Sequence, residues 1–402
     1  MAGARSVGRP EPFVSSSPLP NTVDTVIAVP IRNEAERIAA CLQSIDVQAG
    51  LRPGSLGLVL FLNNCTDGTA AIVADLRPRM SIPLQVVEVA FAGANAGWAR
   101  RAAMDAAAAW IEANGAAGTI LSTDADTRVP PDWVARNLAV LEAGADAVAG
   151  RITLDPDEAA LLPPSLHARG ALEDAYDALL TEAEARIDPD PHDPWPCHRT
   201  TIGASLSVRL AAYRQVGGMP AIPLGEDGAF VAALLSQGFR VRHAREIAVV
   251  VSARLTGRAP GGVADTIRSR CELPDALCDA RMEAFPRALV RYLWRRRLRR
   301  AHAEGRLGRN LAWARLLAIP PAQARAIAAL PQAGLPIAEA ERASPRLRYR
   351  PLGPRQLPRQ IRLATGVLAA MRGALRLRDA VRAALRRGRR ESEAVDVRGT
   401  PV

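Results

Sequence analysis

The sequence predicts an α/β protein in which a mixed, mostly parallel sheet is flanked by helices and followed by a helical, Arg-rich C-terminal extension. Three observations indicate this fold class. Runs of β-branched and aliphatic residues alternate with segments of helical periodicity. Each run ends in a polar loop, and such loops are where open parallel sheets bind ligands. The balance of charge also changes abruptly near residue 280.

The first strand is expected at residues 25–29, a β-branched run that stops at Pro30. The polar loop that follows contains Arg32 and Glu34. Apolar residues at positions 38, 41, 42 and 45 then recur at helical spacing. This segment is therefore predicted to form a strand, a loop and a helix.

Two similar units follow. The run at residues 58–62 ends at Asn63, which opens a polar loop before another helical pattern. The run at residues 84–89 leads into a Gly-containing turn, after which Arg100 and Arg101 lie in an Ala-rich helix. The repetition places polar loops at the carboxyl ends of successive strands.

The next apolar run begins at residue 119 and ends in Asp124, Ala125 and Asp126. In an extended backbone, side chains at i and i+2 point to the same side, so both carboxylates could bind one hard cation such as Mn²⁺ or Mg²⁺. If that cation also binds phosphate, this is a diphosphate site. The alternative is that the two Asp residues only begin the turn before residues 129–131.

A helix is expected at residues 167–186, and a Pro-rich loop at 188–198 displays Trp195 and His198. Because proline limits backbone freedom, this loop could form a preorganised wall or lid of a binding site. A surface loop without a ligand is the alternative. His198 could also complete a metal shell.

Small residues, Gly203 and Ala204, begin the next predicted strand and would let the backbone approach a ligand closely. After a helix at 210–216, Glu226 and Asp227 come directly before an apolar helical pattern. Acidic residues at a helix start can be explained by N-capping and the helix dipole. They could also serve catalysis.

A last strand is expected to end near residue 251, and the basic loop after it carries Arg254 and Arg258. Their guanidinium groups, and those of Arg100 and Arg101, could bind diphosphate oxygens as fixed donors.

The polar motifs described above occur in one order along the chain: residues 29–34, 63–69, 124–126, 203–205 and 225–227. In these motifs the segment from about residue 22 to 270 resembles the family 2 glycosyltransferases, whose nucleotide-sugar domain has the GT-A fold. Many family members carry an acidic residue where Asn63 stands. The resemblance therefore leaves the identity of the nucleotide open.

The resemblance implies a role for each motif. Nucleotide-sugar binding is expected of Pro30, Arg32, Glu34, Asn63, Arg100, Arg101, Asp124, Ala125, Arg254 and Arg258. Acceptor binding is expected of Trp195, His198, Gly203 and Ala204, metal binding of Asp124 and Asp126, and catalysis of Glu226 and Asp227. Asp227 is the candidate base. Many family members place a histidine ligand near the end of the last strand, where this chain has Ser252 or Arg254, so the third protein ligand is not identified.

The expected function is metal-dependent transfer of a sugar from a nucleotide diphosphate sugar to an acceptor hydroxyl, with inversion. One alternative is a non-catalytic membrane- or partner-binding protein built on a GT-A-like domain. A nucleotidyltransferase is disfavoured because it would be expected to have a Gly-rich basic first loop, whereas residues 30–34 are acidic and lack glycine. The donor sugar and the acceptor are not specified by the sequence.

Composition is that of a globular protein, since 49% of the 402 residues are hydrophobic. Residues 1–21 lack the apolar core of a signal peptide and are expected to be a flexible tail. No apolar stretch is long enough for a transmembrane helix, so a cytoplasmic location is expected. A catalytic domain is predicted at 22–280, with a nucleotide-sugar half at 22–150 and an acceptor half at 151–280.

The predicted extension, residues 281–402, differs in charge from the rest. Residues 1–280 contain 24 Arg and 33 acidic residues, a net charge of −9, whereas the extension contains 28 Arg and 8 acidic residues, a net charge of +20. Seven of its Arg residues lie between positions 287 and 300, around Leu293 and Trp294. They suit a basic amphipathic helix at an anionic surface, such as the inner face of the cell membrane. A helix packed on the acidic catalytic domain is the alternative. Nucleic acid is not expected as a partner because the segment has no recognised nucleic-acid motif.

Overall fold

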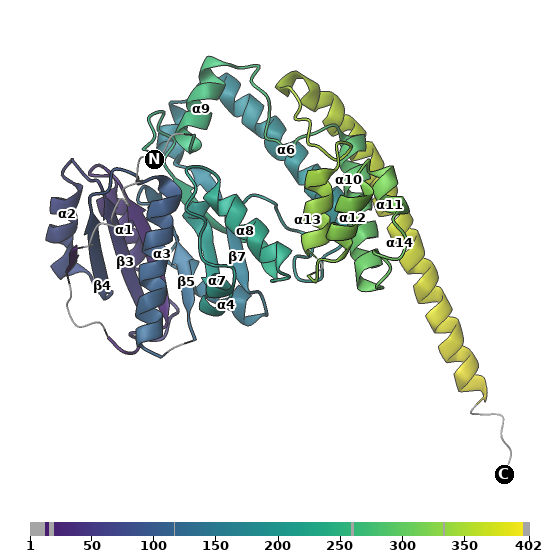
Figure 1. Ribbon diagram of the computed structural model, residues 1–402, viewed down its shortest axis with the longest axis horizontal. Helices are drawn as coiled ribbons and strands as arrows, with labels where there is room; N and C mark the ends of the chain where they lie inside the picture. The colour runs from purple at the N-terminus through teal and green to yellow at the C-terminus, as the bar shows by residue number, and fades with distance from the viewer. Residues whose placement is uncertain (1–12, 16–19, 116, 259–260, 333, 397–402) are drawn as a thin grey trace, which may run out of the picture.

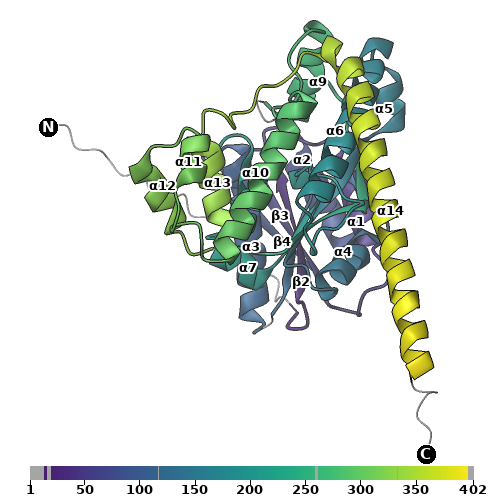
Figure 2. The same ribbon diagram turned by 90° about the vertical axis from the view of Figure 1, so that its right-hand side faces the viewer.

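The computed structural model describes residues 13–15, 20–115, 117–258, 261–332 and 334–396 (Figures 1 and 2). Within these ranges the strands form a nine-stranded sheet in the order β1-β4-β3-β2-β5-β8-β7-β9-β6. Their bounds are β1 Phe13–Ser15, β2 Thr25–Ile31, β3 Leu56–Asn63, β4 Leu84–Val89, β5 Thr119–Ser122, β6 Thr127–Arg128, β7 Ala147–Leu154, β8 Leu206–Arg209 and β9 Val241–Val251. All strands but β1, β6 and β8 run in one direction. The mixed, mostly parallel sheet predicted from the sequence is confirmed.

Helices cover both faces of this sheet (Figure 1). The first face carries α1 Ile38–Asp46, α2 Thr69–Leu76 and α4 Trp133–Glu142. The second carries α3 Ala96–Ala113, α7 Leu210–Gln215 and α8 Glu226–Ser236. Because successive strand residues point to opposite faces, Val26 and Ala28 of β2 join the second core, whereas Ile27 and Val29 join the first. Short 3₁₀ turns lie at η1 Arg77–Arg79 and η2 Gly203–Ser205.

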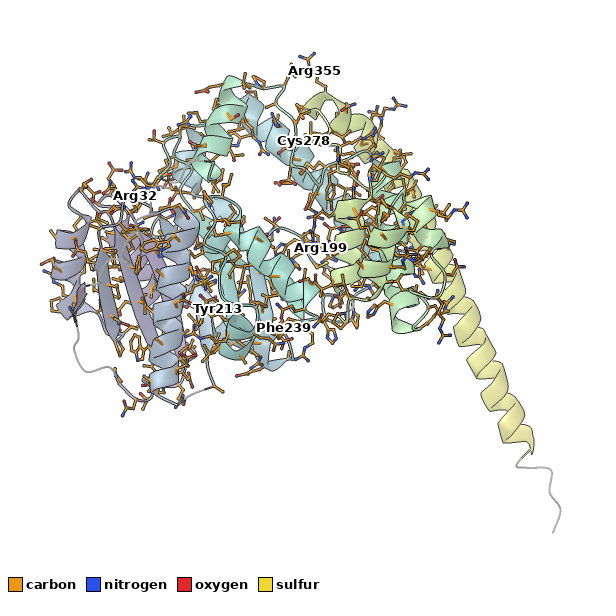
Figure 3. All side chains as sticks on the ribbon, in the orientation of Figure 1. Arg32, Arg199, Tyr213, Phe239, Cys278 and Arg355 are labelled. Atoms are coloured by element: carbon orange, nitrogen blue, oxygen red, sulfur yellow. The ribbon has the colours of Figure 1, made fainter. Side chains whose placement is uncertain are left out.

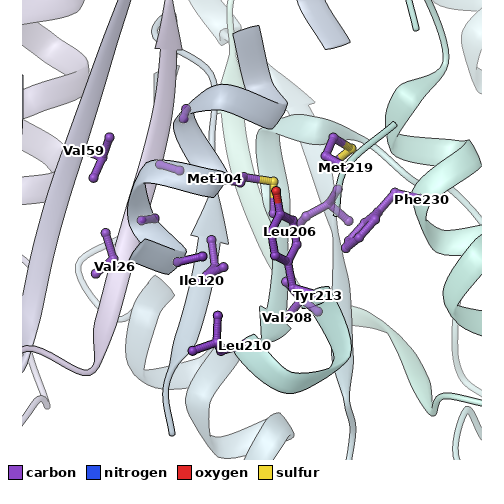
Figure 4. Close-up of a cluster of buried hydrophobic side chains, with 14 of the residues drawn as sticks. Val26, Val59, Met104, Ile120, Leu206, Val208, Leu210, Tyr213, Met219 and Phe230 are labelled. Carbon is purple, nitrogen blue, oxygen red and sulfur yellow. The ribbon is translucent and has the colours of Figure 1, made fainter. Parts of the chain in front are cut away.

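Close packing under α3 fixes the centre of the sheet (Figure 4). Met104 of α3 points toward Leu206 of β8, and Met219 and Phe230 lie on the far side of them. All four side chains are buried. Burial of each such side chain contributes about 1.5–3 kcal/mol, so this face holds β5 and β8 together at the point where the candidate site begins.

The remaining helices extend the molecule on one side of the sheet (Figure 1). They are α5 Pro156–Ala160, α6 Pro164–Ile187, α9 Val263–Glu272, α10 Phe285–Ala303, α11 Ala312–Leu316, α12 Pro321–Ala328, α13 Gly334–Ala343, η3 Pro354–Gln356 and α14 Leu357–Asp396. The helical C-terminal region is thus confirmed. One apolar cluster joins α6 to α10 and α14 through residues that include Tyr176, Phe285 and Leu357. A second lies among α10, α11, α12 and α13.

The longest helix, α14, has 40 residues and would span about 60 Å at 1.5 Å per residue. Its first half packs on α6, and its far end projects past the other helices in both views (Figures 1 and 2). No helix in the described ranges is long and apolar enough to cross a membrane.

Local geometry differs from expectation at two of the motifs. The extended backbone predicted for residues 124–126 is wrong, because the N–H of Thr127 donates to the carbonyl of Asp124 at 3.1 Å and closes a turn. Gly203 and Ala204 form a 3₁₀ turn, and the strand predicted to begin there starts only at Leu206.

Candidate active site

Arg100 joins the two halves of the candidate site. Asn95 caps the helix that carries it, since its side chain accepts the N–H of Trp98. The buried guanidinium donates from Nη2 to Oδ1 of Asp124 at 2.7 Å and from Nε to Oε1 of Glu226 at 3.1 Å. These two carboxylates, whose negative charges favour the protonated guanidinium, hold the pKa of Arg100 above its ordinary value although burial opposes this.

Two further bonds complete the surroundings of Arg100. Nη1 donates to Oγ of Ser122 at 2.9 Å and to the carbonyl of Gly203 at 3.0 Å. A Cβ at position 203 would lie 2.3 Å from the guanidinium carbon, so only glycine fits. The end of β5, the turn η2 and the start of α8 therefore meet on one arginine.

Asp227 lies beside this cluster at the start of α8. Its Oδ2 accepts the backbone N–H of Gly203 at 3.0 Å, and its Oδ1 accepts that of Gly228 at 2.7 Å. Burial raises the pKa of the carboxyl, and the charge of Glu226 adds to this, while the two N–H donors act against it. Glu226 bonds Arg100 instead of capping its helix, so capping does not explain it.

A second cluster lies on the loop after β2. Arg254, which follows β9, donates to both oxygens of Glu34 at 2.7 and 2.5 Å and lies 3.0 Å from Oδ2 of Asp126. Burial and the neighbouring charge of Asp124 raise the pKa of Asp126 to about 7, although Arg254 opposes this. Arg258 donates to the carbonyl of Asn33 at 2.8 Å.

Hydrogen bonds fix the two loops that follow β2 and β3 to each other. The N–H of Glu34 donates to Oγ1 of Thr69 at 2.8 Å, and that of Ala35 donates to Asp67 at 3.2 Å. Asn33, with a φ of 54°, accepts the N–H of Thr66 at 2.7 Å. These loops form a preformed rim at the carboxyl ends of the strands.

Three other predicted donor-side residues lie at or near this rim. Asn63, the last residue of β3, is buried, and its Oδ1 has no hydrogen-bond partner in the described part of the chain. A buried acceptor without a partner is unfavourable and suits a site that a donor group of a ligand completes. Pro30 is half-buried within β2, and Arg32 just after the strand is exposed and lies at this edge of the sheet (Figure 3).

Asp193 fixes the segment between α6 and η2, residues 188–202, which we term the acceptor loop. It is buried, and its Oδ1 accepts the backbone N–H of His243 on β9 at 3.0 Å. Its Oδ2 is hydrogen-bonded to the ring Nδ1 of the same histidine at 2.9 Å. Arg199 and Arg242 also bond its carboxylate. The loop is therefore anchored to the sheet at its centre.

The structure does not bring three of the predicted residues into either cluster. Arg101 donates to the carbonyls of Met219 and Gly217, on the side of α7. Trp195 is half-buried under Arg245. His198 packs edge-on against His243, with ring centroids 5.5 Å apart, and burial lowers its pKa to about 3, which keeps the ring neutral near pH 7.

Among the described side chains, no group of three or more His, Cys, Asp or Glu is arranged to hold a metal ion. Asp124 lies close enough to Asp126 for its charge to raise the pKa of the second carboxyl, and each carboxylate also pairs with an arginine, Arg100 or Arg254. Ala125 between them is buried. Carboxylate oxygens are the ligand type that a hard divalent cation prefers.

Several residues at the site were not predicted from the sequence. Ser122 holds Arg100, and Thr69 with Asp67 holds the loop of Glu34. A serine or threonine next to a strand end is too common to signal such a role. Asp193 carried a weak signal, since an acidic residue in a proline-rich loop often anchors backbone N–H groups.

A mixed, mostly parallel sheet with paired carboxylates at a strand end and a helix start is the arrangement expected of a GT-A-like domain. Residues 26–195 match the family model for glycosyl transferase family 2. The match is confined to this segment, which is therefore similar to the domain of that family. None of the curated proteins matches the chain.

Solved structures with a related arrangement are distant. TarS from S. aureus is 15% identical with a TM-score of 0.42, over 69% of this chain and 44% of that chain, so the match spans less than half of TarS. Its fragment 1–349 with UDP-GlcNAc is 15% identical with a TM-score of 0.44, over 70% and 73%. The mannosyltransferase PcManGT from Pyrobaculum calidifontis, with GDP-Man and Mn²⁺, is 20% identical with a TM-score of 0.40, over 79% and 86%. The family assignment rests on the sequence match.

Proposed function

We propose that the protein transfers a sugar from a nucleotide diphosphate sugar to an acceptor hydroxyl, with inversion at the anomeric carbon. One observation supports this above the others. Arg100 binds Asp124 on the donor side and Glu226 on the acceptor side, next to Asp227, which has a raised pKa. A base for the acceptor and a carboxylate for the donor are thus held a fixed distance apart.

The donor would lie on the rim formed by the loops after β2 and β3. The unpartnered Oδ1 of Asn63 would accept a hydrogen bond from the nucleotide, and Arg32 and Arg258 offer positive charge at the same edge. Asp124 and Asp126 would hold a divalent cation, which supplies positive charge to the leaving diphosphate. Residues 22–150 would thus form the donor half of the domain.

Asp227 would remove the proton of the acceptor hydroxyl. A carboxylate whose pKa is raised binds that proton more readily than an ordinary one. The N–H of Gly203 holds its Oδ2 and leaves the carboxylate in one orientation. Within residues 151–280, the acceptor loop with Trp195 and His198 and the turn of Gly203 and Ala204 would line the acceptor side.

The decisive test uses Asp126→Ala with UDP-GlcNAc and GDP-mannose as probes. We expect one of these donors, in the presence of Mn²⁺, to raise the melting temperature of the wild-type protein and to be hydrolysed by it. Thermal shift measures the first effect and released nucleotide the second. The variant should lose metal-dependent nucleotide binding and turnover while keeping its melting temperature in the absence of ligand.

The matched control is Asp75→Ala, which removes an exposed carboxylate of α2 that pairs with Arg79 of the adjoining turn η1. It should retain full activity. Unimpaired turnover of Asp126→Ala, or full wild-type activity in excess chelator, would exclude the metal assignment.

A second proposal concerns the outer surface of α10. Val290 and Leu293 are about half exposed, at 49% and 52%, and Arg297 continues the same face of the helix. Apolar side chains flanked by arginine suit an anionic membrane surface, where each Arg contributes about 1 kcal/mol. We propose that this face, residues 290, 293 and 297, attaches the enzyme peripherally to such a membrane.

Co-sedimentation with vesicles that contain phosphatidylserine tests this attachment. The double variant Leu293→Gln/Arg297→Gln should bind several-fold less than wild type at low salt, whereas Arg325→Gln on the exposed face of α12 should bind normally. Equal binding of wild type and the double variant would refute the assignment of this face.

A further inference from the structure

A partly buried network of charges runs from the C-terminal helices toward the proposed catalytic pair. At its centre is Arg295 of α10, which binds both carboxylate oxygens of Glu341 on α13 at 2.6 and 3.0 Å. Its Nη1 donates to Oε1 of Glu184 at 2.7 Å. Glu184 lies in the last turn of α6, directly before the acceptor loop.

From Glu184 the network continues into that loop. Nε of Arg199 lies 3.3 Å from Oε2 of Glu184, and Nη1 of Arg199 pairs with Asp193. Asp193 in turn is bonded to His243 of β9. Arg199 is drawn between the sheet domain and the C-terminal helices in Figure 3.

Each charge of this network depends on its partners. Burial disfavours the carboxylate form of Glu184, but Arg295, Arg199 and Arg281 together lower its pKa to about 2. If one partner is removed, the buried charge of Glu184 is less well compensated, and opening of the surrounding segment to hydrate it becomes more favourable. The segment most easily opened is the acceptor loop, because it contains neither helix nor strand.

The loop ends at the catalytic residues. Four positions after Arg199 is Gly203, whose N–H donates to Asp227 and whose carbonyl accepts from Arg100. Any shift of Arg199 is therefore transmitted through few bonds to the group that orients Asp227.

We infer that the C-terminal helices position the catalytic pair through Arg295, Glu184 and Arg199. These three act as positioning residues and contact neither donor nor acceptor. The inference rests on the proposed role of Asp227 as base. It gives part of the Arg-rich segment a place in catalysis, in addition to the surface of α10 proposed above for membrane attachment.

Hydrogen exchange of the full-length protein, without any ligand, tests this coupling. In Arg295→Gln we expect the amides of residues 188–203 to exchange about tenfold faster or more, since an uncompensated buried charge favours local opening. The amides of β5 should keep their protection. Arg295→Lys, which retains the charge, should recover part of the protection.

The matched control is Arg300→Gln on the same helix, because Arg300 is exposed and its ion pair among the described residues is with Glu304, itself exposed. It should exchange like wild type. Arg199→Gln should reproduce the effect of Arg295→Gln, and the double variant should add little. Wild-type exchange of residues 188–203 in Arg295→Gln, or equally faster exchange throughout the chain, would overturn the inference.

Donor turnover gives a second readout. In Arg295→Gln the kcat for the donor that the wild type accepts should fall about tenfold while its KM stays within about twofold, since only the orientation of the base is disturbed. A rise in KM with unchanged kcat would contradict the positioning role. Full turnover of Asp227→Asn would refute the proposed base but leave the exchange result intact, so the two failures are distinguishable.

Discussion

At the scale of single residues, the groups around the carboxylate of Asp227 act on its pKa in opposite directions. Asp227 is surrounded by two backbone N–H donors, which favour its charged form, and by Glu226, which disfavours it. Burial is the largest influence and raises the pKa. Because a base must be deprotonated, activity should decrease as the pH falls through this raised pKa.

Replacing that carboxylate separates chemistry from binding. Asp227→Asn keeps the size of the side chain but removes its basicity, so kcat should fall by about 10²-fold or more while the KM for the donor barely changes. The acidic limb of the pH–rate profile should disappear with it. Steady-state kinetics from pH 5 to 9 check both expectations. A collapse of donor affinity with unchanged turnover would make Asp227 a binding residue.

At the scale of elements, the turn η2 brings Gly203 against a guanidinium. In Gly203→Ala the new Cβ would lie 2.3 Å from the carbon of Arg100. Because Arg100 is also held by Ser122, Asp124 and Glu226, it cannot simply move aside, and we expect a loss of about 1–3 kcal/mol in stability together with most activity. Thermal unfolding and donor hydrolysis measure the two effects.

Gly170→Ala in α6 is the control for this substitution. No heavy atom lies within 4 Å of a Cβ at that position, and alanine should stabilise the helix by about 0.5–1 kcal/mol. If both variants behave alike, Gly203 is not confined by Arg100.

The elements themselves were largely predictable because their signals are local. The apolar run at residues 58–62 falls within β3, and the helical pattern from residue 167 falls within α6. The strand β7 and the helix α4 were not predicted. The partners of charged residues could not be predicted either: Arg100 lies 126 positions from Glu226, and Arg295 lies 111 positions from Glu184. Because the sequence contains many acidic residues, it does not show which of them pairs with a given arginine.

The basic helix illustrates the same limit. Its periodicity predicted α10, but the pattern did not show which arginines face inward. Arg295 pairs with Glu184, and Arg299 pairs with Asp188. These two side chains therefore agree with the alternative, a helix packed on acidic residues of the catalytic domain. The membrane proposal concerns only the exposed face of α10.

At the scale of the whole molecule, the charge network makes the free energy of unfolding depend on pH in the acidic range. The pKa of Glu184 is lowered from 4.5 to about 2. In the range between these values the unfolded chain binds a proton that the folded chain does not, so stability decreases as pH falls. Above pH 4.5 the lowered pKa of Glu184 contributes its full stabilisation of the folded state, about 3 kcal/mol.

Glu184→Gln should remove this dependence. The variant should be less stable than wild type near pH 7, because Arg295 and Arg199 lose a charged partner, yet it should lose less stability on going from pH 5 to pH 2. Urea unfolding at several pH values measures the difference. If the free energy of unfolding of the two proteins changes with pH in the same way, Glu184 is not the source of this pH dependence.

The apolar cluster shared by α6, α10 and α14 has a consequence for a broken chain. The exposed segment at residues 273–277 connects α9 to the C-terminal helices, so a protease that cuts there would sever the backbone but not the core. The two fragments should behave as a split protein: they should elute together from a sizing column, separate only in denaturant, and regain donor hydrolysis when mixed again. Fragment complementation of this kind would show that the Arg-rich region is a folding partner of the catalytic domain.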